Sequence, residues 1–391
     1  MGDGHGTGNG ARLRLARQAR GFSQQQLAAM AGVSRQAVSA VESGQSDPSL
    51  RAALGLARAL GMTVEEVFGS SRPAPQVVAR PVAPLGGEGA RVTLAPMGDG
   101  LVALPLSGAT VSRAGFLPAG GLADGADGAD SEPGTGEQVW PIRPPRRTLV
   151  AAGCDPALPL LETPLGLLDP PVTFSWWPCP SREALGLASE GLVHVAGAHL
   201  RGPAGEYNTG PAAELMPQGG EVIGFCSWRE GLVLRPELAD DVCSVGDLAE
   251  RGLRLVNREP GAEARLVLDR ELSRLGIEAS GLPGYGTQAS GHLHVAAAIA
   301  AGLADAGVAS EPAALAYGLA FVPLTAERFD LVIPASQAGS REVQGLLKVL
   351  SSRWLLDQLA SLPGYDPARC GEHIATLPPA QPGLAPEPAA G

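Results

Sequence analysis

The chain has few aromatic residues, almost no lysine and no paired cysteines. Aromatics make up 4% of its 391 residues, and Lys348 is the one lysine among 29 basic side chains. We assign the lysine bias to genome composition rather than to function. The odd cysteine count and the absence of C-x-x-C spacing argue against a disulfide framework and against a zinc site. The cysteines are Cys154, Cys179, Cys226, Cys243 and Cys370.

Long hydrophobic runs are also missing. The longest apolar stretch, from Val295 to Leu303, is far shorter than the ~18 residues that span a bilayer. The first ten residues are glycine-rich and polar, without the apolar centre of a signal peptide. We therefore expect a soluble, cytoplasmic protein with no membrane partner.

What is present favours several folded domains joined by loops. Apolar residues make up 45% of the chain, enough for a packed core, and its length predicts two or three domains. Its 53 glycines and 35 prolines exceed average usage and predict long loops or linkers.

The net charge of −11 is divided unevenly along the chain. Residues 1–70 carry seven arginines and five acidic residues, whereas the remaining residues have a net charge of −13. Charge therefore has to be judged for each domain, and the total does not exclude a nucleic-acid-binding N-terminus.

Residues 11–69 are predicted to form an all-α domain of five short helices. Serines stand where N-caps are needed, at Ser23 and Ser34, and Gln26 completes a capping box with Ser23. Gly32 and Gly44 follow the second and third helices, as C-terminal glycines do. The expected helices cover residues 12–20, 24–31, 35–42, a stretch after Pro48 and a short stretch after Thr63.

The segment from Ser23 to Gly44, with the preceding Arg20-Gly21-Phe22 and the following Pro48-Ser49-Leu50, resembles the helix-turn-helix of the phage-repressor (Cro or XRE) family. That resemblance implies double-stranded DNA as partner and a third helix that enters the major groove. Arginine pairs with guanine and glutamine with adenine, and a residue at a helix N-terminus can contact phosphate. The candidate DNA-binding residues are Gln24, Ser34, Arg35, Gln36 and Ser39. A homodimer is expected, because half-sites lie about 34 Å apart.

Residues 70–148 change composition and are predicted to be a linker with a small β unit. Residues 70–84 are rich in proline and alanine, as extended linkers are. Residues 92–94 and 101–106 flank Gly98-Asp99-Gly100, which predicts a hairpin. The Ala-Asp-Gly repeat at 123–128 lacks the ligand ladder of a calcium loop, so we expect a flexible loop at 120–136 and no metal.

Residues 149–370 alternate short apolar strands with helices. This order predicts an α/β domain whose parallel sheet is covered on both faces. A length of about 220 residues suits two lobes with a cleft between them, the second lobe at about 235–322. Residues 371–391 are proline-rich and are expected to be a disordered tail.

This region resembles the type II periplasmic-binding-protein-like substrate domain of the molybdate-binding sort, in the form fused to bacterial regulators. The resemblance rests on the following runs: Gly153-Cys154-Asp155-Pro156, residues 194–200, residues 206–208, residues 256–265, Gly284-Tyr285, residues 292–296, residues 302–307 and residues 318–333. It implies a one-component regulator, that is, a multidomain protein with a helical DNA-binding domain, a linker and a two-lobed α/β sensor.

In such a domain, turns from strand to helix can hold an oxyanion through free backbone N–H groups. The implied effector is molybdate or tungstate. However, residues 261–265 lack the hydroxyls usual for that family and add Glu263, so a molybdopterin-type molecule or another polar metabolite is an equal candidate. No bound cofactor is predicted otherwise. The candidate ligand-binding residues are Gly153, Cys154, Asp155, His199, Tyr207, Asn208, Arg258, Gly261, Ala262, Arg265, Tyr285 and His292.

The histidines do not by themselves predict a metal site. On a helix, His292 and His294 point apart by about 200° and cannot chelate one ion together. His199 and His292 are cleft contacts or buried core residues. Trp176-Trp177 is expected to pack rather than to stack on a ligand.

Three functions remain open at this point. The first is an effector-responsive transcriptional regulator. The second is a constitutive repressor whose sensor domain has lost its ligand. The third, which we disfavour, is an enzyme with Cys154 and His199 as a nucleophile pair, because the sequence lacks a nucleophile elbow and a phosphate-binding loop.

Overall fold

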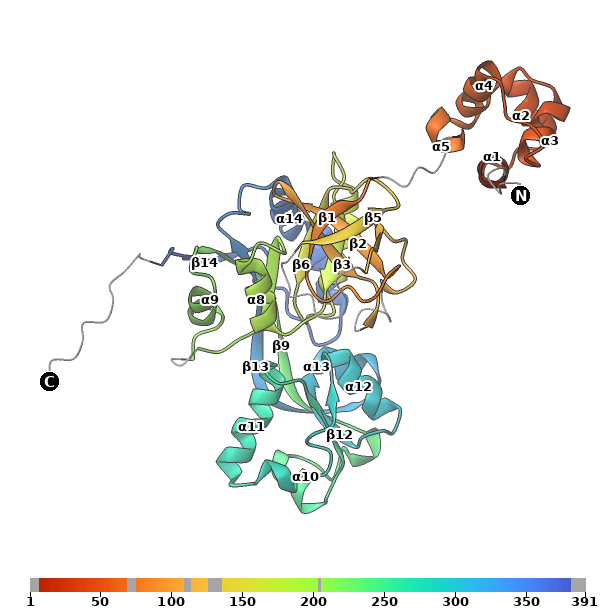
Figure 1. Cartoon of the computed structure of the whole chain (residues 1–391). Helices are drawn as coiled ribbons and strands as arrows, with labels where there is room; N and C mark the ends of the chain where they lie inside the picture. The colour runs from red at the N-terminus through yellow and green to blue at the C-terminus, as the bar shows by residue number, and fades with distance from the viewer. Residues whose placement is uncertain (1–6, 69–74, 109–113, 126–135, 203–204, 381–391) are drawn as a thin grey trace. The chain divides into compact units, whose positions relative to one another are not determined.

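A computed structural model describes residues 7–68, 75–108, 114–125, 136–202 and 205–380 (Figure 1). The chain divides into two compact units, Met1–Ala74 and Pro75–Gly391. Among the helices described, none is long and apolar enough to cross a membrane.

The first unit has the five helices predicted for it. Ser23 forms the expected capping box with Gln26, and the Ser34 hydroxyl accepts from the backbone N–H of Ala37. Gly32 ends the second helix in the left-handed conformation with φ 67°. The helices are α1 (Thr7–Ala19), α2 (Gln24–Ala31), α3 (Arg35–Glu42), α4 (Leu50–Leu60) and α5 (Val64–Phe68).

A buried ion pair lies within this unit beside its apolar core. The core contains Leu13, Leu27, Val38 and Leu56. Glu42, 4% exposed, closes α3, and its carboxylate accepts from Arg17 Nε at 2.6 Å and Nη2 at 3.0 Å. The pair therefore joins α1 to the end of α3.

The segment predicted as a linker is instead a closed five-stranded barrel. Strand β1 pairs with β3 in parallel and with β5 in antiparallel, which closes the order β1-β3-β2-β4-β5. The predicted hairpin is confirmed as β2 and β3. The strands are β1 (Val77–Pro81), β2 (Arg91–Met97), β3 (Gly100–Pro105), β4 (Gly121–Ala123) and β5 (Glu137–Pro141). The second half of the predicted flexible loop, residues 126–135, lies outside the described residues.

The linker prediction was wrong because the strands are short and separated by glycine and proline. Their inward side chains nevertheless form a core of their own, including Val92, Leu94 and Val139. Other barrel residues, among them Met97 and Val102, pack with Val150 and Leu185 of the following domain. The barrel is thus part of the second unit and not a spacer.

The rest of this unit is the predicted two-lobed α/β domain. One sheet runs through it in the order β11-β10-β12-β9-β13-β8-β6-β7, with β14 beside β9. The first lobe contains β6 (Thr148–Ala152), η3 (Leu158–Leu161), α7 (Glu162–Gly166), β7 (Thr173–Trp177), α8 (Ser181–Ser189), β8 (Val195–Ala198), α9 (Thr209–Leu215), α14 (Arg341–Leu350), α15 (Arg353–Ser361) and β14 (His373–Leu377).

The second lobe lies between two long strands, β9 (Gly220–Leu234) and β13 (Ala320–Pro334). It contains η4 (Pro236–Leu238), α10 (Val245–Glu250), β10 (Leu255–Arg258), α11 (Glu263–Leu275), η5 (Ala279–Gly281), β11 (Gln288–Ala289), α12 (His292–Ala300), β12 (Ala306–Ser310) and α13 (Glu311–Ala316).

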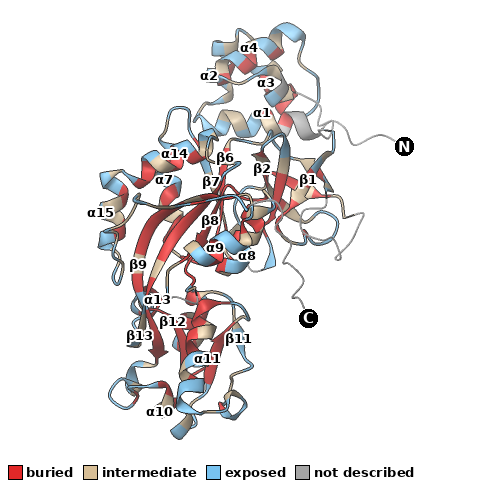
Figure 2. Ribbon diagram, turned by 90° about the vertical axis from the view of Figure 1, so that its left-hand side faces the viewer, coloured by how far each residue is buried: buried red, intermediate tan, exposed pale blue. Residues whose placement is uncertain are grey.

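Both faces of the sheet are covered, as predicted. Along β9, Leu232 and Leu234 belong to one buried cluster and Val233 to another, because alternate side chains point to opposite faces. In the first lobe Val150 and Leu149 divide in the same way. Figure 2 shows buried residues along β8, β9, β12 and β13.

The prediction of a parallel sheet was wrong for its centre. Strands β9 and β13 run antiparallel over their whole length, with register shifts between Pro323 and Thr325 and between Phe329 and Asp330. One end of β9 pairs with β14 and the other with β12, so β9 and β13 belong to both lobes (Figure 1).

The predicted tail begins later than residue 371. Residues His373–Leu377 form β14, whose Leu377 is buried and pairs with Gly220. The prolines at 378 and 379 end this strand, and residues 381–391 lie outside the described residues.

Candidate functional site

The first candidate site is the outer face of α3. Ser34, Arg35, Gln36 and Ser39 are all exposed at its start and along one side. The Ser34 hydroxyl already caps the helix. Arg35 and Gln36 therefore present the long donor-bearing side chains of this face.

Gln24 lies at the N-terminus of α2, as predicted, but its side chain has a structural partner. Its Nε2 donates to Glu42 Oε2 at 2.9 Å. The backbone N–H groups at the start of α2 are what remain there for an anion. Burial alone would raise the pKa of Glu42, but hydrogen bonds from Arg17 and Gln24 outweigh it and lower the pKa.

The second candidate site is a cavity of about 400 Å³ in the second unit, lined by residues of both lobes. Turns that follow β6 and β7 line it from the first lobe, and the end of β10 and the start of α12 line it from the second. The lining residues are Cys154, Pro156, Trp176, Trp177, Pro178, Cys179, Pro180, Glu183, Arg258, Glu259, Pro260, Ser290, Gly291, His292, Leu293 and His294.

Charges in this cavity largely cancel. The Arg258 guanidinium, 1% exposed, donates to both oxygens of Glu259, at 2.8 and 2.9 Å. These bonds and the charge of Arg258 lower the pKa of Glu259 against the opposing effect of burial. Burial raises the pKa of Glu183. A bare anion would therefore meet carboxylates as well as the arginine.

The turn after β6 is stabilised by a close backbone approach at Gly153 and by hydrogen bonds to Asp155. Gly153 has φ 147°, and a Cβ there would lie 3.1 Å from the backbone of Gly197, so the close approach requires glycine. Asp155 accepts from the backbone of Ala157 at 2.7 Å and from the Tyr365 hydroxyl at 3.1 Å. Its burial raises its pKa to about 6. Asp155 thus shapes the turn and is not among the cavity residues.

Several residues predicted to bind ligand have other partners. Arg265 donates to the carbonyl of Arg258 and lies over the ring of Tyr285, whose hydroxyl donates to Asp269. Gly261 and Ala262 precede α11 at this edge. Of the twelve predicted residues, Cys154, Arg258 and His292 line the cavity.

Tyr207 and Asn208 belong to a link between β8 and β13. The Tyr207 hydroxyl donates to the carbonyl of Ala326 at 2.7 Å. The Asn208 amide accepts from Leu200 and donates to Asp330, which holds its backbone at φ 60°. Both residues therefore stabilise the part of β13 that passes from one lobe to the other.

A buried polar cluster contributes to one wall of the cavity. His199 Nε2 lies 3.1 Å from Cys154 Sγ, and the His199 and His292 rings are 5.6 Å apart. One ligand atom from each of Cys154, His199 and His292 lies within 4.8 Å of the others. Cys154 and His199 come from the first lobe and His292 from the second.

Two acidic residues of the shared strands lie beside this cluster. Glu230 of β9 and Glu327 of β13 are buried. Burial raises the pKa of both, that of Glu327 to about 8. Burial also raises the pKa of Cys154 to about 12 and lowers that of His199 to about 3. The sequence predicted Cys154, His199 and His292 as site residues but not Glu230 or Glu327, and it did not predict the cluster, because its members come from five separate elements or turns.

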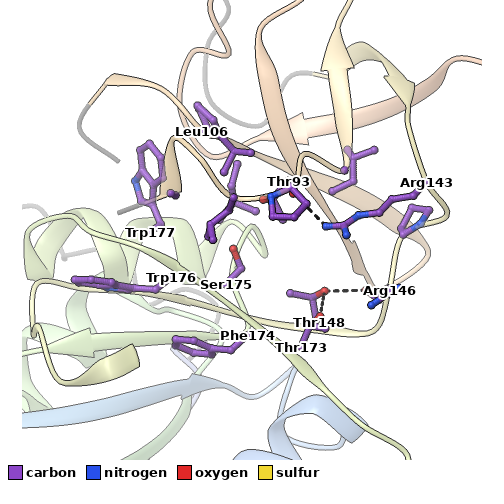
Figure 3. Close-up of a pocket in the computed structure, with 18 of the residues that line it drawn as sticks. Thr93, Leu106, Arg143, Arg146, Thr148, Thr173, Phe174, Ser175, Trp176 and Trp177 are labelled. Carbon is purple, nitrogen blue, oxygen red and sulfur yellow. Dashed lines mark hydrogen bonds between the residues drawn. The ribbon is translucent and has the colours of Figure 1, made fainter. Parts of the chain in front are cut away.

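A second cavity, of about 250 Å³, lies between the barrel and the first lobe. Figure 3 shows Thr93 and Leu106 of the barrel region facing Ser175 and Trp176 of β7. Arg143 donates to the carbonyl of Pro118 at its rim. The Thr148 and Thr173 hydroxyls, which also line it, hydrogen-bond to each other.

Comparison with known proteins identifies both regions. A family model described as helix-turn-helix matches residues 13–67, and one described as a PBP superfamily domain matches residues 165–351. The uncharacterized HTH-type transcriptional regulator MJ0272 of Methanocaldococcus jannaschii is 39% identical over 57 residues, which cover 15% of this chain and 86% of that protein.

Two further similarities concern the second unit. The uncharacterized protein YvgK of Bacillus subtilis is 27% identical over 189 residues, 47% of this chain, and the chain covers 60% of that protein's length. The solved effector-binding domain of QuiR with shikimate is 10% identical and has a TM-score of 0.39, covering 51% of this chain and 93% of that one.

Proposed function

The chain belongs to the HTH-type transcriptional regulators and carries a PBP superfamily domain, and from this premise we propose that it is an effector-responsive, DNA-binding regulator. The observation that carries the proposal is the cavity of about 400 Å³ lined by both lobes. An effector there would contact two lobes that share the strands β9 and β13. Binding would then favour one lobe arrangement over another, which is how a ligand shifts a conformational equilibrium.

DNA recognition is proposed for α3. Arg35 and Gln36 are exposed and carry the donors that pair with guanine and adenine edges. Two copies of the chain, bound as a homodimer, would read half-sites about 34 Å apart. The rest of the chain is acidic and would repel DNA, which would leave α3 as the surface that contacts it.

For the effector, the cavity favours a small polar organic molecule over a bare four-oxygen anion. Its volume of about 400 Å³ exceeds what molybdate or tungstate needs, and Glu259 already neutralises Arg258. A molybdopterin-type molecule combines the size of the cavity with the ligand class that the sequence resemblance implies. Molybdate and tungstate are therefore tested beside it as effectors.

The test is reciprocal coupling between DNA and effector. Duplexes selected by the full chain from a random pool would be titrated with protein alone and with molybdate, tungstate, sulfate or an extract of molybdenum cofactor. We expect one probe to change DNA affinity, and DNA to change the affinity for that probe by the same factor. Unchanged affinity with every probe would favour the constitutive repressor.

A first prediction concerns the reading face. Arg35→Ala and Gln36→Ala should each weaken binding to the selected duplex by about 5- to 150-fold, the equivalent of about 1–3 kcal/mol for one bidentate base contact. Fluorescence anisotropy on duplexes changed one base pair at a time measures this loss and shows whether discrimination relaxes at one position.

Arg58→Ala provides the control for charge. Arg58 is exposed on α4, away from the start of α3, so its loss removes the same charge from the same domain. It should leave base preference unchanged. Equal losses of specificity for Arg58→Ala and Arg35→Ala would contradict the assignment of α3 as the reading helix.

A further inference from the structure

The buried cluster of Cys154, His199 and His292 has the composition of a transition-metal site. Thiolate and imidazole are the ligands that zinc-type ions prefer. The three side chains are at most 7% exposed, and one ligand atom from each lies within 4.8 Å of the others. We propose that these three residues bind one divalent ion of the zinc type, which joins the two lobes and leaves a coordination position open to the cavity.

Unpartnered polar atoms support this assignment independently. Among the described residues, His199 Nδ1, His292 Nε2 and both carboxylate oxygens of Glu230 and Glu327 lack a hydrogen-bond partner. Buried polar atoms in proteins are normally paired, and leaving one unpaired destabilises the fold. Of these atoms, His292 Nε2 is the one that a metal would take up, whereas His199 Nδ1 and the carboxylates of Glu230 and Glu327 lie beside the site as unpaired neighbours.

Glu230 and Glu327 stand where metal sites place their supporting carboxylates. Glu327 Oε2 lies 4.0 Å from His199 Nδ1, and Glu230 Oε1 lies 3.7 Å from His292 Nδ1. In metal sites a ligating histidine donates its other ring N–H to a carboxylate, which orients the ring. Each histidine here has its own carboxylate for that purpose.

Two arginines oppose a cation at this position: Arg201, whose Nε lies 3.7 Å from Glu327 Oε1, and Arg258. Arg258 Nη1 lies 3.3 Å from His292 Nδ1. Its charge is matched by Glu259 through two hydrogen bonds, so the cluster faces an ion pair and not a free cation. A dication with one thiolate would retain a single positive charge, which Glu230 and Glu327 can balance.

For the metal to bind, the Cys154 thiol must release its proton to solvent through the cavity and the proton on His292 must move. Nδ1 now accepts from the backbone N–H of Ser310 at 3.1 Å, and Nε2 is the free atom. With metal on Nε2, the proton would lie on Nδ1 and be donated to Glu230. The Ser310 N–H would then lose its present acceptor, and Glu230 is the cross-strand partner of Ser310.

The open position links this site to regulation. Three protein ligands leave a fourth position of a tetrahedral ion free, as in zinc sites that bind an exchangeable ligand. Cys154 and His292 line the cavity, so that position faces the effector. This part of the inference rests on the proposed function, whereas binding of the ion itself does not.

The test is metal stoichiometry in the full-length protein. Metal-free protein would be titrated with Co²⁺ and with Zn²⁺, with absorption spectroscopy and elemental analysis as readouts. We expect one ion per chain and, for Co²⁺, a thiolate-to-metal charge-transfer band. Zn²⁺ should also raise the unfolding temperature, because an ion that binds only the folded state stabilises it.

Variants identify the ligands. Cys154→Ser should abolish the charge-transfer band, and His292→Gln should abolish tight binding. Glu327→Gln should retain the band but weaken affinity by about 10- to 100-fold, as loss of a supporting carboxylate does. Cys243→Ser and His373→Gln alter an exposed cysteine and an exposed histidine, and both should leave stoichiometry and spectrum unchanged.

Two results would overturn the proposal. One is wild-type protein that takes up no Co²⁺ and shows no thermal shift with Zn²⁺. The other is a charge-transfer band that persists in folded Cys154→Ser protein, with folding checked by circular dichroism. Neither result depends on DNA, so the metal site and the regulator function can fail separately.

Discussion

Arg17→Met is expected to lower the stability of the first unit by about 3 kcal/mol. The Glu42 carboxylate is buried and accepts two hydrogen bonds, at 2.6 and 3.0 Å, from Arg17. Removing one partner of a buried ion pair leaves an uncompensated charge and typically costs about 3–5 kcal/mol. We place the effect at the lower end because Gln24 still donates to Glu42.

Amide hydrogen exchange of residues 7–68 measures this loss directly. Tryptophan fluorescence does not, because all five tryptophans lie at position 140 or beyond and report on the second unit alone. Arg14→Met is the control: the Arg14 side chain is half exposed and its Nε lies 3.8 Å from Glu42. It should cost at most about 1 kcal/mol. Equal losses in the two variants would show that the buried pair is not what stabilises α1 against α3.

The same pair sets a pH dependence for the first unit. Because the pKa of Glu42 is lowered in the folded state, its contribution is complete above the usual glutamate pKa, ~4.3, and is lost as the pH falls below that value. In Arg17→Met, the Glu42 carboxylate is still buried but no longer accepts hydrogen bonds from Arg17, so the pKa of Glu42 should rise above its wild-type value. The variant should therefore lose stability at a higher pH than the wild type, which exchange rates measured across an acid series would show.

Phe329→Ala should lower the stability of the second unit by about 3–5 kcal/mol, the usual cost of deleting a buried aromatic ring. Phe329 is fully buried on β13, and its ring centre lies 5.5 Å from that of Trp228 and 6.1 Å from that of Phe225. It also fills the space left by Gly197, where a Cβ would come within 2.2 Å of the Phe329 ring. The cavity left behind would lie in the first-lobe core, beside Phe225 and Trp228.

Urea unfolding followed by tryptophan fluorescence measures this change, with Trp228 next to the substituted residue. Phe116→Ala is the matched control, since Phe116 is 96% exposed and its loss should change stability by less than about 0.5 kcal/mol. A loss below about 1 kcal/mol for Phe329→Ala would mean that neighbouring side chains collapse into the space and that the packing around the strands is adaptable.

The first unit could be predicted closely from sequence because its signals are local. Capping serines, C-terminal glycines and an apolar stripe each lie within one helix, and all five helices formed as expected. The ion pair was not predicted, since Arg17 and Glu42 meet only when α1 packs on α3. The alternation of strands and helices likewise predicted two lobes, but pairing across the long strands β9 and β13 is not a local property.

The candidate site was predicted in part. Cys154, Arg258 and His292 line the cavity, as the turns after β6 and β10 suggested. Arg265 instead lies over the ring of Tyr285, and the Tyr285 hydroxyl donates to Asp269 of α11. These contacts depend on side-chain packing, so the sequence alone did not predict them. The absence of C-x-x-C spacing argued against a zinc site, but that rule describes ligands that lie close together on one loop. Cys154 and His199 follow strands and His292 begins α12, and only the folded sheet brings the three together.

The barrel has a consequence for how this chain could have been assembled during evolution. Val77, in its first strand, pairs with Val139 in its last, so the polypeptide enters and leaves the barrel at neighbouring points about 5 Å apart. By connectivity, the barrel could be inserted or excised as a cassette without displacing the flanking chain. By packing it could not, because Met97, Val102 and Leu104 share a core with Val150 and Trp177. Excision would expose that apolar surface to water. The α/β domain therefore needs the barrel for its packing, although the connectivity of the chain would allow the barrel to be removed.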